Sequence, residues 1–146
     1  MRHRAARAQT QPRKQILLIE DDPDSGRALA LGLQLRGFEV KWATSGRQAV
    51  RQMPPGRFRG PNPGAPDLVL LDLQLPDANG AVVARRLREK GRVDPPIIAI
   101  SSGSQSAADE AGRRVGAAAM VAKPVAMDDL LRKIDRVFSA RRAATS

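Results

Sequence analysis

The sequence contains no cysteine, no tyrosine, one histidine and one tryptophan among 146 residues. The lack of cysteine excludes disulfides, thiolate metal sites and thiol catalysis. No apolar run approaches the roughly 18 residues that a membrane-spanning helix needs, and residues 1–14 lack the apolar centre of a signal peptide. We therefore expect a cytoplasmic protein without a transmembrane segment. At this length a single domain with one hydrophobic core is expected.

Positive charge is concentrated at the two ends of the chain. The formal net charge is +10 at pH 7, and residues 1–14 and 141–142 hold 7 of the 25 basic residues. We expect a basic, disordered N-terminal tail over 1–14 and a short C-terminal tail over 140–146. Such ends are most often simply solvated, although they can also bind nucleic acid or anionic membrane through phosphate charge. No aromatic residue lies among these arginines, so base stacking is not expected.

Four short apolar runs are each followed by a charged or hydroxyl side chain. In chain order these side chains are Glu20 with Asp21, then Asp72, Ser101 and Lys123. Together with an edge strand expected at Phe38 to Ala43 and the helical segments between the runs, they predict an α/β fold: a doubly wound, five-stranded parallel sheet with helices on both faces. Because the carboxyl ends of parallel strands meet at one edge of a sheet, the polar side chains are predicted to converge there.

The carboxylates in this set suggest a metal site. A single strand-final residue such as Asp72 can simply cap the following loop. Three carboxylates at one edge, however, repel one another unless a cation compensates them. Oxygen ligands of this kind suit Mg²⁺. Asp22 is not counted among these carboxylates, because it precedes Pro23 and is expected to be the N-cap of the next helix.

At these positions the chain resembles a known family, the receiver domain of two-component response regulators. The resemblance covers residues 15–139 and rests on E-D-D after the first strand, D-L-Q-L-P-D-A-N-G from Asp72, the strand-final serine, and K-P at Lys123. It implies the flavodoxin-like strand order 2-1-3-4-5. It further implies a stand-alone, chemotaxis-regulator-like protein.

The resemblance also implies roles for individual residues. Asp72 would be the phospho-acceptor, Lys123 the lysine that pairs with the phosphoryl group, and Ser101 the switch hydroxyl. Such a protein is not a classical enzyme, but it catalyses its own phosphorylation and dephosphorylation at Asp72. The implied Mg²⁺ ligands are Glu20, Asp21, Asp72 and the backbone carbonyl of Gln74.

One position departs from the family pattern. The family usually has an aromatic residue three positions before the lysine, and this chain has Met120 there. We expect Ser101 and Met120 to form the switch, because a flexible thioether can fill the place of a ring. The helix predicted over 104–115 is rich in alanine and glycine, so it is expected to be marginal.

The partners implied by the resemblance are a histidine kinase or a histidine phosphotransfer protein as donor, and a downstream protein of unknown identity. A phosphorylation-dependent dimer is a further expected form. Only eight residues follow Phe138, so no DNA-binding domain is expected. Two alternatives stay open: a receiver-like scaffold whose basic tails bind nucleic acid or anionic membrane, and a relay module of a hybrid kinase.

Two further segments lead to structural expectations. Ala28, Leu31 and Leu35 recur at helical spacing after Pro23, and Gly37 marks the end of that helix. Residues 54–66 contain five prolines in thirteen positions and form an insertion relative to the family pattern. We expect this loop to be a tolerated surface excursion, with a docking loop centred on Phe58 as the alternative.

Overall fold

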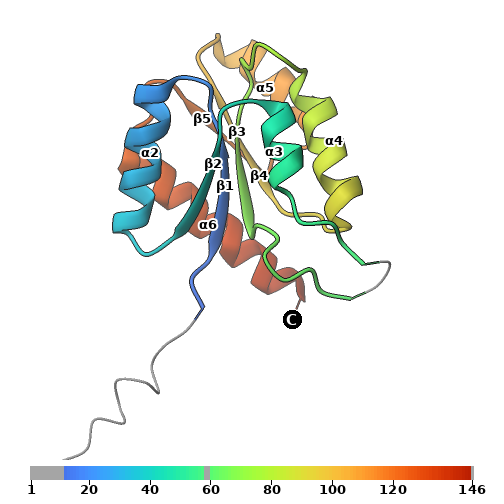
Figure 1. Ribbon diagram of the computed structural model, residues 1–146. Helices are drawn as coiled ribbons and strands as arrows, with labels where there is room; N and C mark the ends of the chain where they lie inside the picture. Colours follow the sequence, from blue (N-terminus) through green and yellow to red (C-terminus); the bar gives the residue numbers. More distant parts are fainter. Residues whose placement is uncertain (1–11, 58–59, 146) are drawn as a thin grey trace, which may run out of the picture.

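The computed structural model describes residues 12–57 and 60–145, which form one parallel sheet enclosed by helices. The strand order is β2-β1-β3-β4-β5, the order that the resemblance implies. Helices α3, α4 and α5 cover one face of the sheet, and α2 and α6 cover the other (Figure 1). The strands are β1 (Gln15–Ile19), β2 (Glu39–Ala43), β3 (Leu68–Asp72), β4 (Ile97–Ser101) and β5 (Ala119–Ala122). The helices are α2 (Pro23–Leu35), α3 (Gly46–Gln52), α4 (Gly80–Gly91), α5 (Gln105–Val115) and α6 (Met127–Thr145).

The middle of the sheet is apolar on both faces. All five residues of β3 are buried, and β4 shows the same pattern. Alternate β3 side chains enter two separate cores: Val69 and Leu71 face α3 and α4, while Leu68 and Leu70 face α2 and α6. This double burial explains why the strand is a continuous apolar run instead of an alternating one.

Helix α2 is present, but its buried face differs from the predicted one. Asp22 is the N-cap, as expected, and its Oδ2 accepts a hydrogen bond from the Ser25 amide at 2.7 Å. The helix buries Leu29 and Leu33 against the sheet, whereas Leu31 and Leu35 are 55% and 75% exposed. The sequence contains two overlapping leucine series, and only contact with β1 and β2 selects between them.

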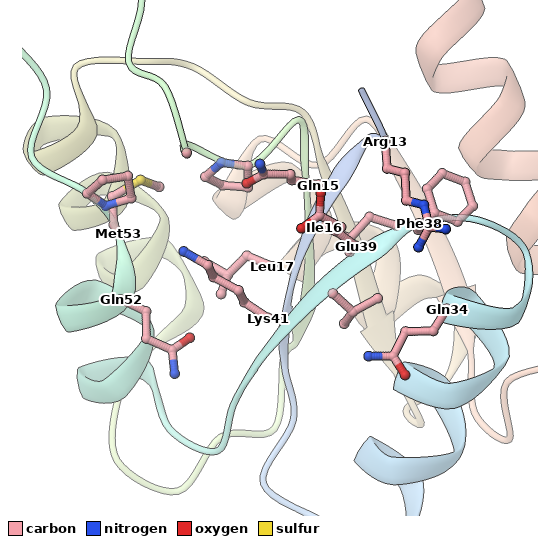
Figure 2. A pocket seen from close by; sticks show the side chains of 14 residues that line it. Arg13, Gln15, Ile16, Leu17, Gln34, Phe38, Glu39, Lys41, Gln52 and Met53 are labelled. Carbon is pink, nitrogen blue, oxygen red and sulfur yellow. The ribbon is translucent and has the colours of Figure 1, made fainter. Parts of the chain in front are cut away.

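The proline-rich loop 54–66 is attached to the end of α4. The Asn62 side-chain amide donates to the carbonyls of Pro54 and Gly91, both at 2.9 Å. The Gly56 amide donates to the Lys90 carbonyl at 2.9 Å. Beside the loop, at the amino ends of β1 and β2, a hollow of about 330 Å³ is lined by polar and apolar side chains (Figure 2). The alternative centred on Phe58 lies outside the described residues.

The predicted N-terminal and C-terminal tails can be compared with the structure at each end of the described chain. Helix α6 continues to Thr145, so the expected C-terminal tail from residue 140 is helical over 140–145. Its sequence D-R-V-F-S-A-R-R-A-A-T contains no glycine or proline that would end the helix near 139. The predicted N-terminal tail falls almost wholly on residues 1–11, outside the described part. Among the described residues, no helix has the length and apolarity to cross a membrane.

Candidate functional site at the carboxyl edge of the sheet

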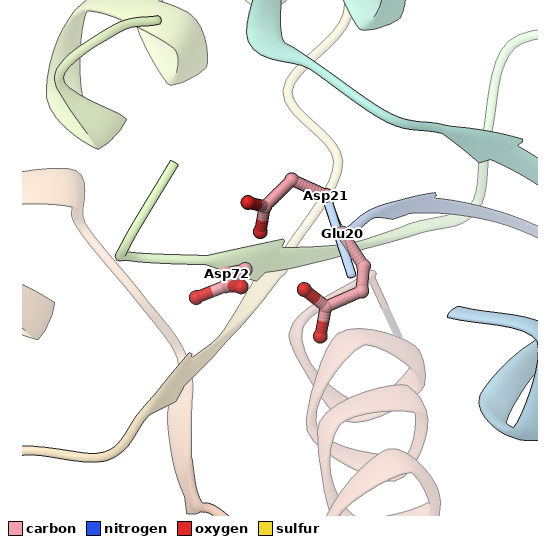
Figure 3. Close-up of side chains that lie close together, drawn as sticks. All are labelled: Glu20, Asp21 and Asp72. Carbon is pink, nitrogen blue, oxygen red and sulfur yellow. The ribbon is translucent and has the colours of Figure 1, made fainter. Parts of the chain in front are cut away.

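Three carboxylates meet where β1 and β3 end. Glu20 and Asp72 are buried, with 1% and 0% exposure, and Asp21 is exposed. One oxygen of each lies within 4.8 Å of the others. Figure 3 shows the three side chains converging from the two neighbouring strands. The predicted convergence follows from the register, because Ile19 and Leu71 are paired across β1 and β3 and the acids come directly after them.

Lys123 completes the group from the end of β5. Its Nζ donates to Asp72 Oδ2 at 2.9 Å and lies 3.8 Å from Glu20 Oε1. The Lys123 amide donates to the Ser101 carbonyl at 2.9 Å, which ties the end of β5 to the end of β4. The Lys123–Pro124 peptide bond is cis. The sequence therefore predicted correctly that this ammonium reaches the carboxylates.

The buried carboxylates have opposite pKa shifts. Burial and the neighbouring Asp72 raise the pKa of Glu20 from 4.5 to about 7. Burial would also raise the pKa of Asp72, but hydrogen bonds from Glu20, Lys123 and the Gln74 amide outweigh it and lower that pKa. For Lys123, attraction to Asp72 and Glu20 outweighs burial and raises the pKa. At neutral pH the site thus holds Asp72 ionised beside a lysine cation.

The donor set fits a hard divalent cation. Glu20 Oε1 is buried and has no hydrogen-bond partner within the described residues, and Lys123 Nζ at 3.8 Å is too far to donate to it. A closer cation would satisfy this oxygen. Carboxylate oxygens converging at one point are the ligands that Mg²⁺ takes. Gln74 lies on the same loop, and its amide donates to Asp72 Oδ1 at 2.9 Å.

The side chain of Gln74 takes part in the site as well, which the sequence did not reveal. Its Oε1 accepts a hydrogen bond from Ser102 Oγ at 2.7 Å. This contact joins the loop after β3 to the loop after β4. Ser101, one residue earlier, is 8% exposed, and its Oγ accepts a longer hydrogen bond of 3.3 Å from the Gly103 amide. The two serines therefore have different partners, and no spacing rule distinguishes them in advance.

Met120 is packed against helix α5. A Cβ atom built on Gly112 would lie 2.3 Å from Met120 Sδ, so the thioether occupies the space that a side chain at 112 would need. The glycine that makes α5 a weak helix by propensity is thus the residue that admits Met120. The assignment of Ser101 and Met120 as a switch stays a prediction.

Trp42 is a second residue that the sequence did not connect with the site. Its indole N–H donates to the Glu20 carbonyl at 2.9 Å, from the neighbouring strand β2. A Cβ atom on Gly26 would lie 2.1 Å from the indole ring, so the first turn of α2 is shaped around it. A signal existed in the sequence, because glycine within a helix costs stability relative to alanine and this one follows the acidic cluster.

Comparison with known proteins agrees with the fold and the edge geometry. Residues 16–135 match the family model for the response regulator receiver domain. The chain belongs to this family. It is 34% identical over 123 residues to the transcriptional regulatory protein QseB of Escherichia coli O157:H7, covering 84% of this chain and 52% of QseB. The chain spans about half the length of the curated relatives it matches.

Solved structures show the same architecture. A CheY-like receiver domain from Methanospirillum hungatei JF-1 superposes with a TM-score of 0.75 at 22% identity, covering 91% of this chain and 99% of that one. The non-phosphorylated HemR receiver domain from Leptospira biflexa gives a TM-score of 0.67 at 33% identity, covering 87% and 95%. Receiver domains interact with histidine kinases and use Mg²⁺ in phosphorylation.

Proposed function

We propose that Asp72 accepts a phosphoryl group from a histidine kinase or a histidine phosphotransfer protein, and that the phosphorylated protein signals through contacts with other proteins. The observation that supports this most directly is the 2.9 Å contact between Lys123 Nζ and Asp72 Oδ2 at a buried carboxylate. The lysine holds Asp72 ionised and oriented, which a nucleophilic carboxylate requires.

The reaction is a displacement at phosphorus. A carboxylate oxygen of Asp72 forms a bond to phosphorus while the P–N bond of the donor phosphohistidine breaks. The imidazole leaves with the electron pair and takes up a proton. Asp72 is fixed by the Gln74 amide on one oxygen and by Lys123 on the other, so its orientation needs little adjustment. Lys123 then pairs with the phosphoryl oxygens, and Ser101 Oγ can donate to one of them.

Glu20, Asp21 and Asp72 would hold Mg²⁺, with the Gln74 carbonyl as a further ligand. When bound, the cation supplies positive charge against the phosphoryl oxygens. A hollow of about 710 Å³ beside Glu20 and Lys123 leaves room for a donor side chain. The alternative scaffold function, with binding of nucleic acid or membrane by the tails, depends mainly on residues 1–11 and gains no support from the described contacts.

Phosphorylation is tested by incubating the protein with acetyl phosphate and Mg²⁺ and measuring its intact mass. The wild type should gain one acid-labile phosphoryl group. Asp72→Asn should gain none, and Asp21→Ala should gain it at least ten-fold more slowly. Asp77→Asn is the matched control, because Asp77 is an exposed carboxylate of the same loop outside the cluster. Full labelling of Asp72→Asn would exclude this residue as the acceptor.

A further inference from the structure

Helices α3 and α4 have much more positive charge than the other helices. Together they contain five arginines and one lysine against a single acid, Glu89. Acidic and basic residues balance in α2 and in α5, and α6 has an excess of two basic residues. The two basic helices lie side by side on one face of the sheet (Figure 1).

Three of the six basic side chains are engaged in contacts that stabilise the fold. Lys90 Nζ donates to the Val50 and Arg51 carbonyls at the end of α3, at 2.8 and 3.1 Å. Arg88 pairs with Asp94 at 2.8 Å, and Arg85 lies 3.8 Å from Glu89. Their charges are accounted for by the packing of the domain.

The other three arginines line one hollow between the two helices. Arg47 and Arg51 of α3 and Arg86 of α4 are all exposed, and all line a depression of about 180 Å³. Across residues 12–57 and 60–145, Arg51 and Arg86 form no ion pair. Arg47 is attracted to Asp77, whose carboxylate accepts hydrogen bonds from the Gly46 and Arg47 amides at 3.0 and 3.1 Å. Asp77 compensates part of this positive charge, and binding of a further anion would reduce the repulsion that remains among the three guanidinium groups.

Apolar side chains also line the depression. Val50, Val82 and Ala78 are partly buried and Val83 is buried, and Asp77 is the one acid among the lining residues. Three arginines beside apolar side chains are complementary to an apolar side chain flanked by carboxylates. A nucleic-acid backbone offers phosphates but no apolar group that would pack against these side chains, and no aromatic residue lines the hollow for base stacking.

We propose that the α3–α4 surface formed by Arg47, Arg51 and Arg86 binds an acidic protein segment that inserts an apolar residue between the helices. This surface adjoins the loop after β3 through Asp77 and Ala78, and it contains none of the residues assigned to phosphoryl transfer. The surface can therefore be tested in the unphosphorylated protein, apart from phosphoryl transfer to Asp72.

The test uses a displayed random dodecapeptide library, selected on the unphosphorylated protein. Binding of the enriched peptides is then measured by fluorescence anisotropy. We expect sequences with an apolar residue flanked by aspartate or glutamate. They should bind at least ten-fold more weakly to Arg47→Gln/Arg51→Gln/Arg86→Gln. Replacing the central apolar residue of a peptide by serine should weaken binding at least three-fold. The matched control is Arg27→Gln/Arg113→Gln/Arg132→Gln, which removes the same charge from exposed positions on α2, α5 and α6 and should change binding less than two-fold.

Several results would overturn the proposal. One is a selection without any peptide that depends on the three arginines, and another is an equal loss in both triple variants, which would indicate a net-charge effect only. A 20-base-pair duplex that binds more tightly than the peptides, with the same arginine dependence, would assign the surface to nucleic acid. Melting temperatures of both variants within about 2 °C of the wild type show that the fold is intact.

Discussion

Polar groups at the two ends of the sheet differ in whether their hydrogen bonds are formed. At the carboxyl edge, Glu20 and Asp72 are buried next to each other, and Glu20 Oε1 has no partner within the described residues. At the amino edge, the loop 54–66 lies on the end of α4 and joins it through Asn62 and Gly56. The first arrangement keeps charge available for a ligand at the expense of stability, whereas the second contributes stability through its hydrogen bonds.

The largest expected effect is a pH dependence of stability that originates at the carboxyl edge. The folded state raises the pKa of Glu20 to about 7, so it retains a proton that the unfolded chain loses above 4.5. Stability of the metal-free protein should therefore fall between pH 5 and 8, by on the order of 2 to 3 kcal/mol. Because the pKa of Asp72 is lowered, this residue stays ionised between pH 5 and 8 and does not alter the predicted loss of stability.

Thermal unfolding in EDTA at pH 5.5 and 8 measures this effect. Asp72→Asn should flatten the dependence, because Glu20 then loses its charged neighbour, and it should raise the melting temperature at pH 8 relative to the wild type. Asp77→Asn is the control and should keep the wild-type slope. A wild-type melting temperature that does not change over this range would mean that burial and Asp72 do not raise the pKa of Glu20.

A second prediction compares the same substitution at both edges. A Cβ atom on Gly56 would lie 2.0 Å from the Gly91 carbonyl oxygen, so Gly56→Ala must displace the loop from α4. We expect a loss of about 2 kcal/mol in urea unfolding. At Gly103, in the loop after β4, the nearest atom would be 3.8 Å away, and Gly103→Ala should change stability by less than about 0.5 kcal/mol. Equal losses of stability in the two variants would mean that the loop at Gly56 is not packed more tightly than the loop at Gly103.

Magnesium should offset the repulsion among the carboxylates at the carboxyl edge and so stabilise the folded protein. Binding of Mg²⁺ to Glu20, Asp21 and Asp72 would stabilise the folded state by about 1.4 kcal/mol at a free concentration ten times the Kd. The melting temperature of the wild type at pH 8 should rise with MgCl₂, while Asp21→Ala should respond far less. Matching concentrations of NaCl, adjusted for ionic strength, control for screening. A rise of equal size in both proteins would place the cation elsewhere.

The smallest predicted effect concerns Asp77, a carboxylate at the same edge whose hydrogen bonds are complete. Amides of Gly46 and Arg47 hold its pKa below the ordinary value. Its contribution is therefore present above the unfolded pKa and is lost as the pH falls, opposite in sign to that of Glu20. Because the group is exposed, Asp77→Ala should cost about 0.5 to 1 kcal/mol at pH 7 and less near pH 3. Urea unfolding at the two pH values measures this, and a larger cost at pH 3 would reverse the sign.

The edge that holds the chemistry was predictable from the sequence. Strand length, burial on both faces and the right-handed crossover rule indicate a parallel sheet. In such a sheet the carboxyl ends of all strands lie at the same edge. Residues directly after a strand, such as Glu20, Asp72 and Lys123, then have little freedom in where they lie. For that reason the predicted convergence agrees with the structure, whereas the strand order was expected only from the resemblance to the receiver family.

Contacts between segments far apart in the chain were decided only by the tertiary structure. The buried face of α2 depends on which leucines meet the sheet, and local spacing allows both series. The hydrogen bond from Ser102 to Gln74 and the hydrogen bond from Trp42 to Glu20 each join loops or strands that come together only in the folded sheet. Asn62 holds its loop through a carbonyl 29 residues away. Sequence periodicity indicates whether a residue lies in a helix or a strand. These contacts depend instead on how the helices, strands and loops are placed relative to one another, which packing alone determines.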